Sequence, residues 1–160
     1  MPMKNISSYW LTKNQIKEMF AVAKKTRNFA FSHRSMHKIG ASVLTADGNI
    51  YGWCNVESVI SWLWTCAERC AVDNAVAHGH YDIVAVCTVD SWFTPTCGAC
   101  LQYIILFSQV SGNDIVLINW DIKGNYEIAL LSKLLPQWYR TQSNLEAIKS
   151  YSKNRKIIKK

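Results

Sequence analysis

The sequence lacks any long hydrophobic run. Its longest apolar stretches, such as Ile83 to Cys87, are far too short to cross a bilayer, and it contains no internal repeat or low-complexity segment. The N-terminus, Met1 to Tyr9, lacks the basic-then-apolar pattern of a secretory signal. These absences predict a cytoplasmic protein without a membrane partner, in which the six cysteines are reduced thiols available for metal rather than disulfides.

Negative charge is nearly missing from the C-terminal end. From Arg140 onward there are seven lysines and arginines and only one acidic residue, Glu146, so this segment carries most of the net charge of +7. The remaining chain is close to neutral and does not steer polyanions. We therefore predict one body at residues 1–140 and a basic C-terminal helix or tail at residues 141–160. Nucleic-acid binding through this tail is the less favoured interpretation.

The pattern of apolar residues predicts an α/β fold. With 160 residues, of which 49% are hydrophobic and 18% charged, the chain can build one core. The predicted order is helix, strand, strand, helix, strand, helix, strand, strand, helix, at residues 12–27, 39–45, 50–56, 66–79, 82–90, 97–110, 114–120, 126–129 and 142–152, with a short helical turn at 130–135. This order implies a mixed sheet of about five strands flanked by helices. Strands joined through a helix are expected to run parallel.

Three cysteines have the spacing of a catalytic zinc site. Cys97 and Cys100 are three residues apart, so they share one face of a helix, and Cys66 supplies a third thiol from the neighbouring helix. Three protein ligands leave the fourth tetrahedral position open for water. Both Cys66 and Cys97 are predicted at helix starts, where the helix dipole stabilises the thiolate form that binds metal.

The two residues Glu68 and Arg69 follow Cys66 closely. Glu68 can face the open coordination position without binding the metal, so it is the candidate general acid and base. Arg69 can offset the negative charge of the thiolates from the second coordination shell, although it could instead be an arginine on a helix surface. The three thiols could also belong to a structural zinc site with Cys70, Cys87 or a histidine as the fourth ligand.

These motifs resemble the cytidine deaminases, the small, homotetrameric branch of the zinc deaminases with three cysteine ligands. The resemblance covers about residues 35 to 139. Besides the cysteine motifs, three segments are similar to the family's V-G-A, N-x-E and L-L-P-x-x-F motifs, namely Ile39-Gly40-Ala41, Asn55-Val56-Glu57 and Leu134 to Tyr139. The resemblance implies a three-layer cytidine-deaminase-like fold and Zn²⁺ as the cofactor.

The resemblance also implies a role for each matching residue. Water activated by zinc would attack C4 of a pyrimidine nucleoside, and Glu68 would protonate N3 and then the leaving amine. Asn55 and Glu57 would bind the ribose hydroxyls, and the Ala67 backbone would help to hold the base. The remaining substrate-binding residues would be His37, which stands where the family has a stacking aromatic, and Tyr139, which would reach a neighbouring subunit of a homotetramer.

The predicted function is hydrolytic deamination of cytidine or deoxycytidine to uridine or deoxyuridine, with release of ammonia. Three departures from the family pattern concern the substrate side: His37, Thr96 in place of the proline before the second ligand, and the tryptophan-containing loop 57–65. They leave open a deaminase of a modified cytosine nucleoside, such as blasticidin S. The sequence is also compatible with a polynucleotide cytosine deaminase and with a non-catalytic zinc-stabilised scaffold.

Overall fold

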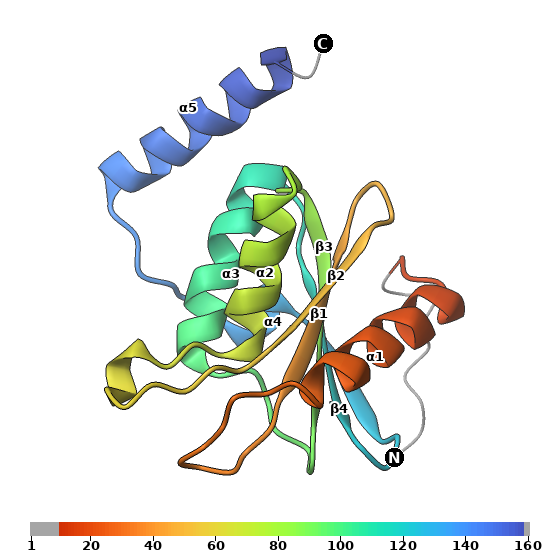
Figure 1. Ribbon diagram of the computed structural model, residues 1–160. Coiled ribbons are helices and arrows are strands. Elements are labelled where there is room, and N and C mark those ends of the chain that lie inside the picture. Colours follow the sequence, from red (N-terminus) through yellow and green to blue (C-terminus); the bar gives the residue numbers. More distant parts are fainter. Residues whose placement is uncertain (1–9, 159–160) are drawn as a thin grey trace.

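Five strands form one mixed sheet in the computed structural model, which describes residues 10–158 (Figure 1). Their order across the sheet is β2-β1-β3-β4-β5, in which β3 and β4 are parallel and the other neighbours are antiparallel. The strands are β1 (Gly40–Thr45), β2 (Ile50–Cys54), β3 (Ile83–Asp90), β4 (Val116–Asp121) and β5 (Tyr126–Leu130). The predicted mixed sheet is confirmed, including the parallel pair joined through a helix.

Helices cover both faces of this sheet, so the molecule has three layers. Figure 1 shows α1 (Lys13–Arg27) on one face, with α2 (Ala67–Ala77) and α3 (Gly98–Ser111) side by side on the other. The shorter or peripheral helices are the 3-10 helix η2 (Ser61–Leu63), α4 (Leu131–Leu134) and α5 (Gln142–Ile158), of which α5 contacts α3. Within the described residues, every helix is too short or too polar to cross a membrane.

Local sequence signals explain why α1 forms where it does. The Thr12 hydroxyl accepts a hydrogen bond from the Gln15 backbone, and the Gln15 side chain accepts one from the Thr12 backbone, which is a capping box. Helical spacing then buries Ile16, Met19 and Ala23 against the sheet. The first helix was expected over residues 12–27, and the structure has it at Lys13–Arg27 with Thr12 as its N-cap.

A glycine on β1 lets α1 lie close to the sheet. A Cβ atom at Gly40 would lie 1.9 Å from the Ala23 carbonyl oxygen and 2.7 Å from the Arg27 nitrogen. Next along the strand, the Ser42 hydroxyl donates a 2.8 Å hydrogen bond to the Met19 carbonyl oxygen. Gly40 is therefore a packing residue for the layer opposite α2 and α3.

The site-bearing face of the sheet can be traced along β3 and β4. Val86 and Leu117 belong to the core beneath α2 and α3, whereas alternate residues belong to the core beneath α1. Because side chains alternate along a strand, Thr88 and Asn119 also face α2 and α3. Both strands end two residues later, at the edge where α2 and α3 begin.

Several predicted boundaries differ from the observed ones. The second hairpin strand was expected to reach Val56, but β2 ends at Cys54, because the Asn55 side chain instead accepts a 2.8 Å hydrogen bond from the Ile39 nitrogen. The C-terminal helix was expected to stop at Ser152, and it continues to Ile158. The stretch 1–9, on which the prediction about secretion depends, and the last two lysines lie outside the described residues.

Candidate active site

Three thiols meet at the N-terminal ends of α2 and α3. Cys66 and Cys97 are the N-cap residues of these helices, and Cys100 lies in the first turn of α3. Their sulfur atoms all lie within 4.8 Å of one another, and no other described residues form such a group of three possible metal ligands. This grouping leaves Cys70 outside, so the fourth cysteine ligand of a structural zinc site is not provided.

The thiols share protons and negative charge. Hydrogen bonds from the thiols of Cys100 and Cys97, together with the Arg69 guanidinium, lower the pKa of Cys66 to about 6 despite its burial. The hydrogen bond with Cys66 raises the pKa of Cys100, because that thiol keeps its proton to share it. A thiolate therefore forms at neutral pH even without metal, as a zinc ligand requires.

Arg69 belongs to this cluster rather than to a free helix surface. Burial alone would lower the pKa of Arg69, but the charges of Cys66, Cys100 and Cys97 outweigh it and raise the pKa. Its Nη2 donates a 3.0 Å hydrogen bond to the Trp64 carbonyl oxygen, whereas its buried Nε has no partner among the described residues. A buried cationic donor without a partner is what fully ionised thiolates would satisfy, so the residues present fit a bound zinc ion.

Glu68 is buried beside the thiols. It lies in the first turn of α2 and is 5% exposed. Burial raises the pKa of Glu68 to about 7, an effect to which the negative charge of Cys66 adds. The neighbouring Cys100 thiol and Arg69 cation oppose this rise without outweighing it. A carboxyl group that gains and loses its proton near neutral pH suits proton transfer.

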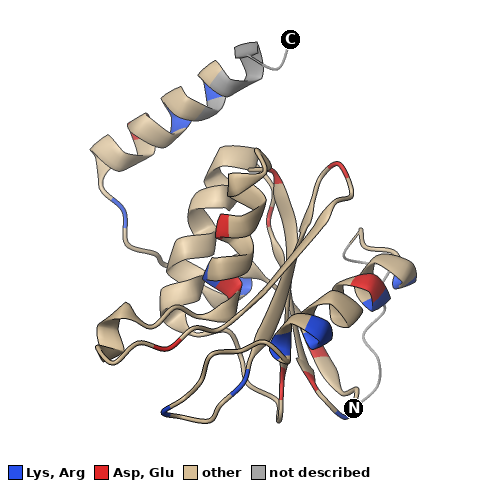
Figure 2. Cartoon of the chain, in the orientation of Figure 1, with Lys and Arg blue, Asp and Glu red and all other residues tan. Residues whose placement is uncertain are grey.

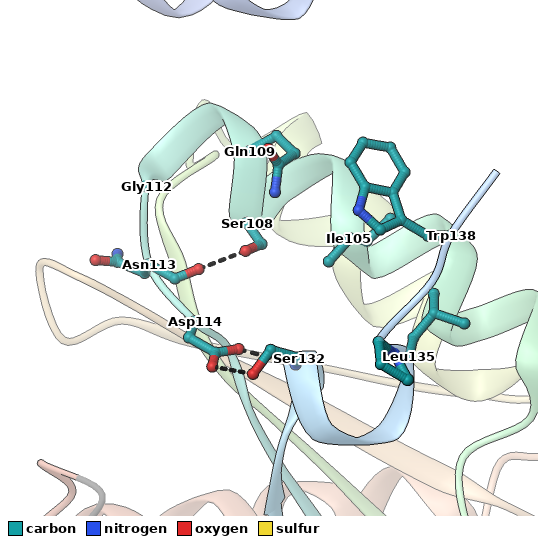
Figure 3. A pocket seen from close by; sticks show the side chains of 10 residues that line it. Ile105, Ser108, Gln109, Gly112, Asn113, Asp114, Ser132, Leu135 and Trp138 are labelled. Atoms are coloured by element: carbon teal, nitrogen blue, oxygen red, sulfur yellow. Dashed lines mark hydrogen bonds between the residues drawn. The ribbon is translucent and has the colours of Figure 1, made fainter. Parts of the chain in front are cut away.

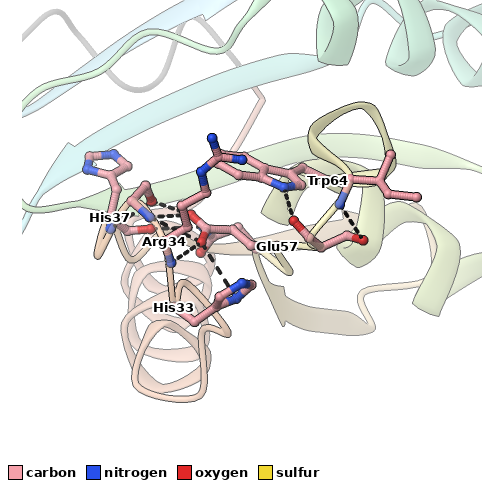
Figure 4. Close-up of polar contacts among 9 residues, drawn as sticks. His33, Arg34, His37, Glu57 and Trp64 are labelled. Atoms are coloured by element: carbon pink, nitrogen blue, oxygen red, sulfur yellow. Dashed lines mark hydrogen bonds and ion pairs between the residues drawn. The ribbon is translucent and has the colours of Figure 1, made fainter.

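The predicted sugar-binding residues brace the loop between α1 and β1, as Figure 4 shows for Glu57. Glu57 accepts hydrogen bonds from the Arg34 nitrogen at 2.8 Å, from the Ser35 nitrogen at 3.2 Å and from the Ser35 hydroxyl. Asn55 donates a 2.9 Å hydrogen bond to the His37 carbonyl oxygen. Both side chains thus shape the loop, and their contact with a ribose stays a prediction.

His37 has a buried acidic partner that the sequence motifs did not reveal. Its Nε2 lies 2.9 Å from the Asp90 Oδ2, and the Asp90 side chain is only 2% exposed. The His37 ring packs on Trp92 with 4.6 Å between ring centres. A lone aspartate closing an apolar strand was the available signal for this partner, because a carboxylate at such a position needs a donor.

The two other predicted substrate-binding residues, Ala67 and Tyr139, differ in their exposure. Ala67 is fully buried at the start of α2. Tyr139 is 76% exposed, and Gln102 holds its backbone with two hydrogen bonds of 2.9 and 2.8 Å. An exposed aromatic on a fixed backbone is available to another molecule, and its role in a neighbouring subunit stays a prediction.

The tryptophan-containing loop leads directly into Cys66. Trp62 is 84% exposed on η2, whereas Trp64 is anchored by a 2.5 Å hydrogen bond from its Nε1 to the Ser58 carbonyl oxygen. The Arg34 guanidinium lies over the Trp64 ring, 5.9 Å from its centre (Figure 4). This loop departs from the family pattern and is well tied to the loop that Glu57 braces.

A cavity of about 430 Å³ lies at the other end of α3 (Figure 3). It is lined by residues that include Ser108, Asp114, Ser132 and Trp138. Because α3 rises about 1.5 Å per residue, its two ends are roughly 20 Å apart. This cavity is therefore separate from the thiol cluster, and its Asp114 carboxylate is already occupied by the Ser132 nitrogen and hydroxyl.

The charged side chains of the described residues are spread over several elements (Figure 2). Figure 2 shows lysine and arginine distributed mainly over α1, the loops and the C-terminal segment. Within α5 the exposed described lysines are Lys149 and Lys153. The charges that matter for the site are therefore the local ones at Arg69 and Glu68.

Comparisons with known proteins agree with this geometry. The zinc-binding region of cytidine and deoxycytidylate deaminases matches residues 13–112. A cytidine deaminase from Sporosarcina psychrophila is 36% identical over 123 residues, which cover 76% of this chain and 88% of that protein. One from Halalkalibacterium halodurans is 30% identical over 114 residues, covering 70% and 84%. The crystal structure of cytidine deaminase from Burkholderia pseudomallei has a TM-score of 0.72 at 28% identity, covering 81% of this chain and 100% of that one. The chain therefore belongs to the cytidine and deoxycytidylate deaminase family.

Proposed function

We propose that this protein is a zinc-dependent cytidine deaminase, which hydrolyses cytidine or deoxycytidine to the corresponding uridine nucleoside and ammonia. The observation that carries the proposal is a buried glutamate beside three clustered thiols. Its relatives that are named cytidine deaminases support the same substrate class. Zinc held by Cys66, Cys97 and Cys100 would supply an acidified water.

The protein's own groups account for the proton movements. Glu68 can take a proton from the attacking water and give it to N3 of the base, and can later take the proton of the new hydroxyl on C4 and give it to the departing amine. Its raised pKa, about 7, keeps both protonation states accessible near neutral pH. Arg69 beside the thiols offsets their negative charge, so that the site remains able to polarise a neutral substrate.

The sugar and base would be held by groups around this centre. Glu57 accepts hydrogen bonds from two backbone donors and one hydroxyl, and a carboxylate can accept about four, so it keeps capacity for a ribose hydroxyl. Asn55 shares the loop with it. The backbone of Ala67 would contact the base, and His37 would form a wall of its pocket.

We further propose a homotetramer whose sites are completed by Tyr139 of a neighbouring subunit. Large apolar side chains are exposed in the loop before α2, including Val59 at 83%, Trp62 at 84% and Leu63 at 58%. Exposed apolar surface of this kind is typical of a contact between subunits. Tyr139, exposed and fixed by Gln102, is suited to a role in trans.

The decisive experiment measures ammonia release by zinc-loaded protein from cytidine, deoxycytidine and a modified cytosine nucleoside. Glu68→Gln should abolish turnover while zinc content stays at the wild-type value. Asp73→Asn, on the same helix, is the control for a lost carboxylate outside the thiol cluster. The proposal fails if stoichiometrically zinc-loaded wild-type protein releases no ammonia from cytidine or deoxycytidine.

A further inference from the structure

A buried hydrogen-bond network joins the sheet to the segment that precedes Cys97. Thr88 on β3 and Asn119 on β4 are register partners, and the Thr88 hydroxyl donates a 2.8 Å hydrogen bond to the Asn119 Oδ1. The same oxygen accepts a 3.0 Å hydrogen bond from the Thr96 hydroxyl. All three residues are buried, at 5%, 5% and 7% exposure. Two strands and the segment before α3 therefore converge on one amide oxygen.

This network holds the residue that directly precedes Cys97. Thr96 directly precedes Cys97, the N-cap residue of α3, whose side chain makes no capping hydrogen bond. Cys97 is also exposed, so surrounding side chains do not enclose it. The preceding residue is then the point at which the thiol's backbone is tied to the rigid sheet.

This hydrogen bond stands where the family pattern has a different backbone restraint, the ring of a proline. The family pattern has proline directly before this cysteine, and proline fixes its own φ angle. Here Pro95 stands one residue earlier and Thr96 takes the position. A threonine backbone has no ring constraint, but its hydroxyl can be held by a partner on the sheet.

We propose that Thr96, anchored by Asn119 and Thr88, is a positioning residue that holds Cys97 in the geometry for zinc. This inference rests on the zinc site of the proposed function and assigns roles to three residues outside that site. Thr96 touches neither metal nor substrate and acts through the backbone of Cys97. Partners that hydrogen bond directly to a metal ligand typically change metal affinity by 10- to 100-fold when removed, and a residue that acts through the ligand's backbone should lie near the lower end of that range.

The neighbouring Thr94 provides a matched control. Its buried hydroxyl has no hydrogen-bond partner among the described residues. Thr94→Val and Thr96→Val make the same chemical change in the same segment, but only the second removes a hydrogen bond. Thr96→Ser keeps the hydroxyl and serves as the conservative rescue. Thr88→Val removes the other hydrogen bond on Asn119 and leaves the one from Thr96 in place.

The test measures zinc affinity by competition with a chromophoric chelator, and the absorption spectrum of the Co²⁺-substituted protein. We expect Thr96→Val to weaken zinc binding about tenfold or more and to alter the cobalt–thiolate bands. Thr94→Val and Thr96→Ser should match the wild type, and Thr88→Val should lose less affinity than Thr96→Val. If Thr96→Val is insoluble, Thr96→Ala deletes the same hydroxyl without placing a methyl group there.

Two results would overturn the proposal: wild-type affinity and spectrum in Thr96→Val or Thr96→Ala, or an equal loss in Thr94→Val. The second would mean that zinc affinity responds to any such change in this segment. These measurements do not depend on the substrate. A protein that binds zinc as expected but releases no ammonia would therefore refute the proposed function and leave this inference standing.

Discussion

Replacing Glu68 by glutamine should stabilise the metal-free protein at alkaline pH while abolishing catalysis. The carboxyl has an ordinary pKa of 4.5, and burial raises it to about 7 in the folded chain. The folded state therefore holds this proton more tightly than the unfolded state does. The contribution of Glu68 to stability is fully present below pH 4.5 and is lost as the pH rises through 7.

The size of the effect follows from the difference between the two pKa values. Each pKa unit corresponds to about 1.4 kcal/mol, so ionising Glu68 at pH 8 or above costs the folded state about 3 kcal/mol. Glutamine is neutral at every pH and keeps nearly the same volume. The variant should therefore be more stable than the wild type by up to about 3 kcal/mol at pH 8, and the difference should nearly vanish at pH 4.5.

The assay is urea denaturation of chelator-treated, reduced protein from pH 4.5 to 8.5 at fixed protein concentration. Subtracting the variant's curve from the wild-type curve cancels groups that titrate in both and lie away from residue 68, and the difference retains the coupling of Glu68 to Cys66. Glu18→Gln, at an exposed position on α1, is the matched control and should give a flat difference curve. A flat curve for Glu68→Gln, or a wild type that is more stable at pH 8, would refute the assignment of a raised pKa to this residue.

Three further predictions concern the assembly, the thiols and the packing. Mixing inactive Glu68→Gln with Tyr139→Ala should restore part of the ammonia release, since mixed tetramers would contain sites with both intact groups. Mixtures no more active than their components would argue against sites shared between subunits. Arg69→Gln should raise the pKa of Cys66 above its value of about 6, because the neighbouring cation is lost. Alkylation rates of the metal-free protein measured against pH would detect this change. An unchanged dependence of the rate on pH would contradict the role of Arg69. Gly40→Ala should lower the free energy of unfolding by about 3 kcal/mol or prevent folding, because its Cβ would overlap the Ala23 carbonyl. Gly98→Ala has open space around its Cβ and should leave the free energy of unfolding nearly unchanged. Chemical denaturation compares the two variants.

The features that the sequence predicted correctly depend on local signals. Thr12 and Gln15 form a capping box within four residues, so the start of α1 is visible in the chain. The short spacing of Cys97 and Cys100 fixes their common face once a helix begins there. Fold class and the thiol cluster could therefore be predicted without coordinates.

The features that were missed depend on partners distant in the chain. His37 meets Asp90 across 53 residues, and Thr96 meets Asn119 across 23. Neither pair follows from periodicity, because each requires knowing which strand ends beside which loop. The bracing of the loop by Glu57 was hidden for the same reason, since its donors include backbone groups that carry no sequence signal.

The lowered pKa of Cys66 and the raised pKa of Glu68 both suit the charge balance of a zinc-loaded site. Three thiolates exceed the two positive charges of zinc by one, and Arg69 supplies one more positive charge, so the ligand sphere and its neighbour are together neutral. A second fixed anion there would need its own cation, and within this cluster the chain provides none. A buried carboxyl that is easily protonated avoids that cost, which is why burial of Glu68 suits its proposed function even though it destabilises the folded chain at alkaline pH. The stability lost through Glu68 and the proton transfer that it can perform thus have the same physical origin.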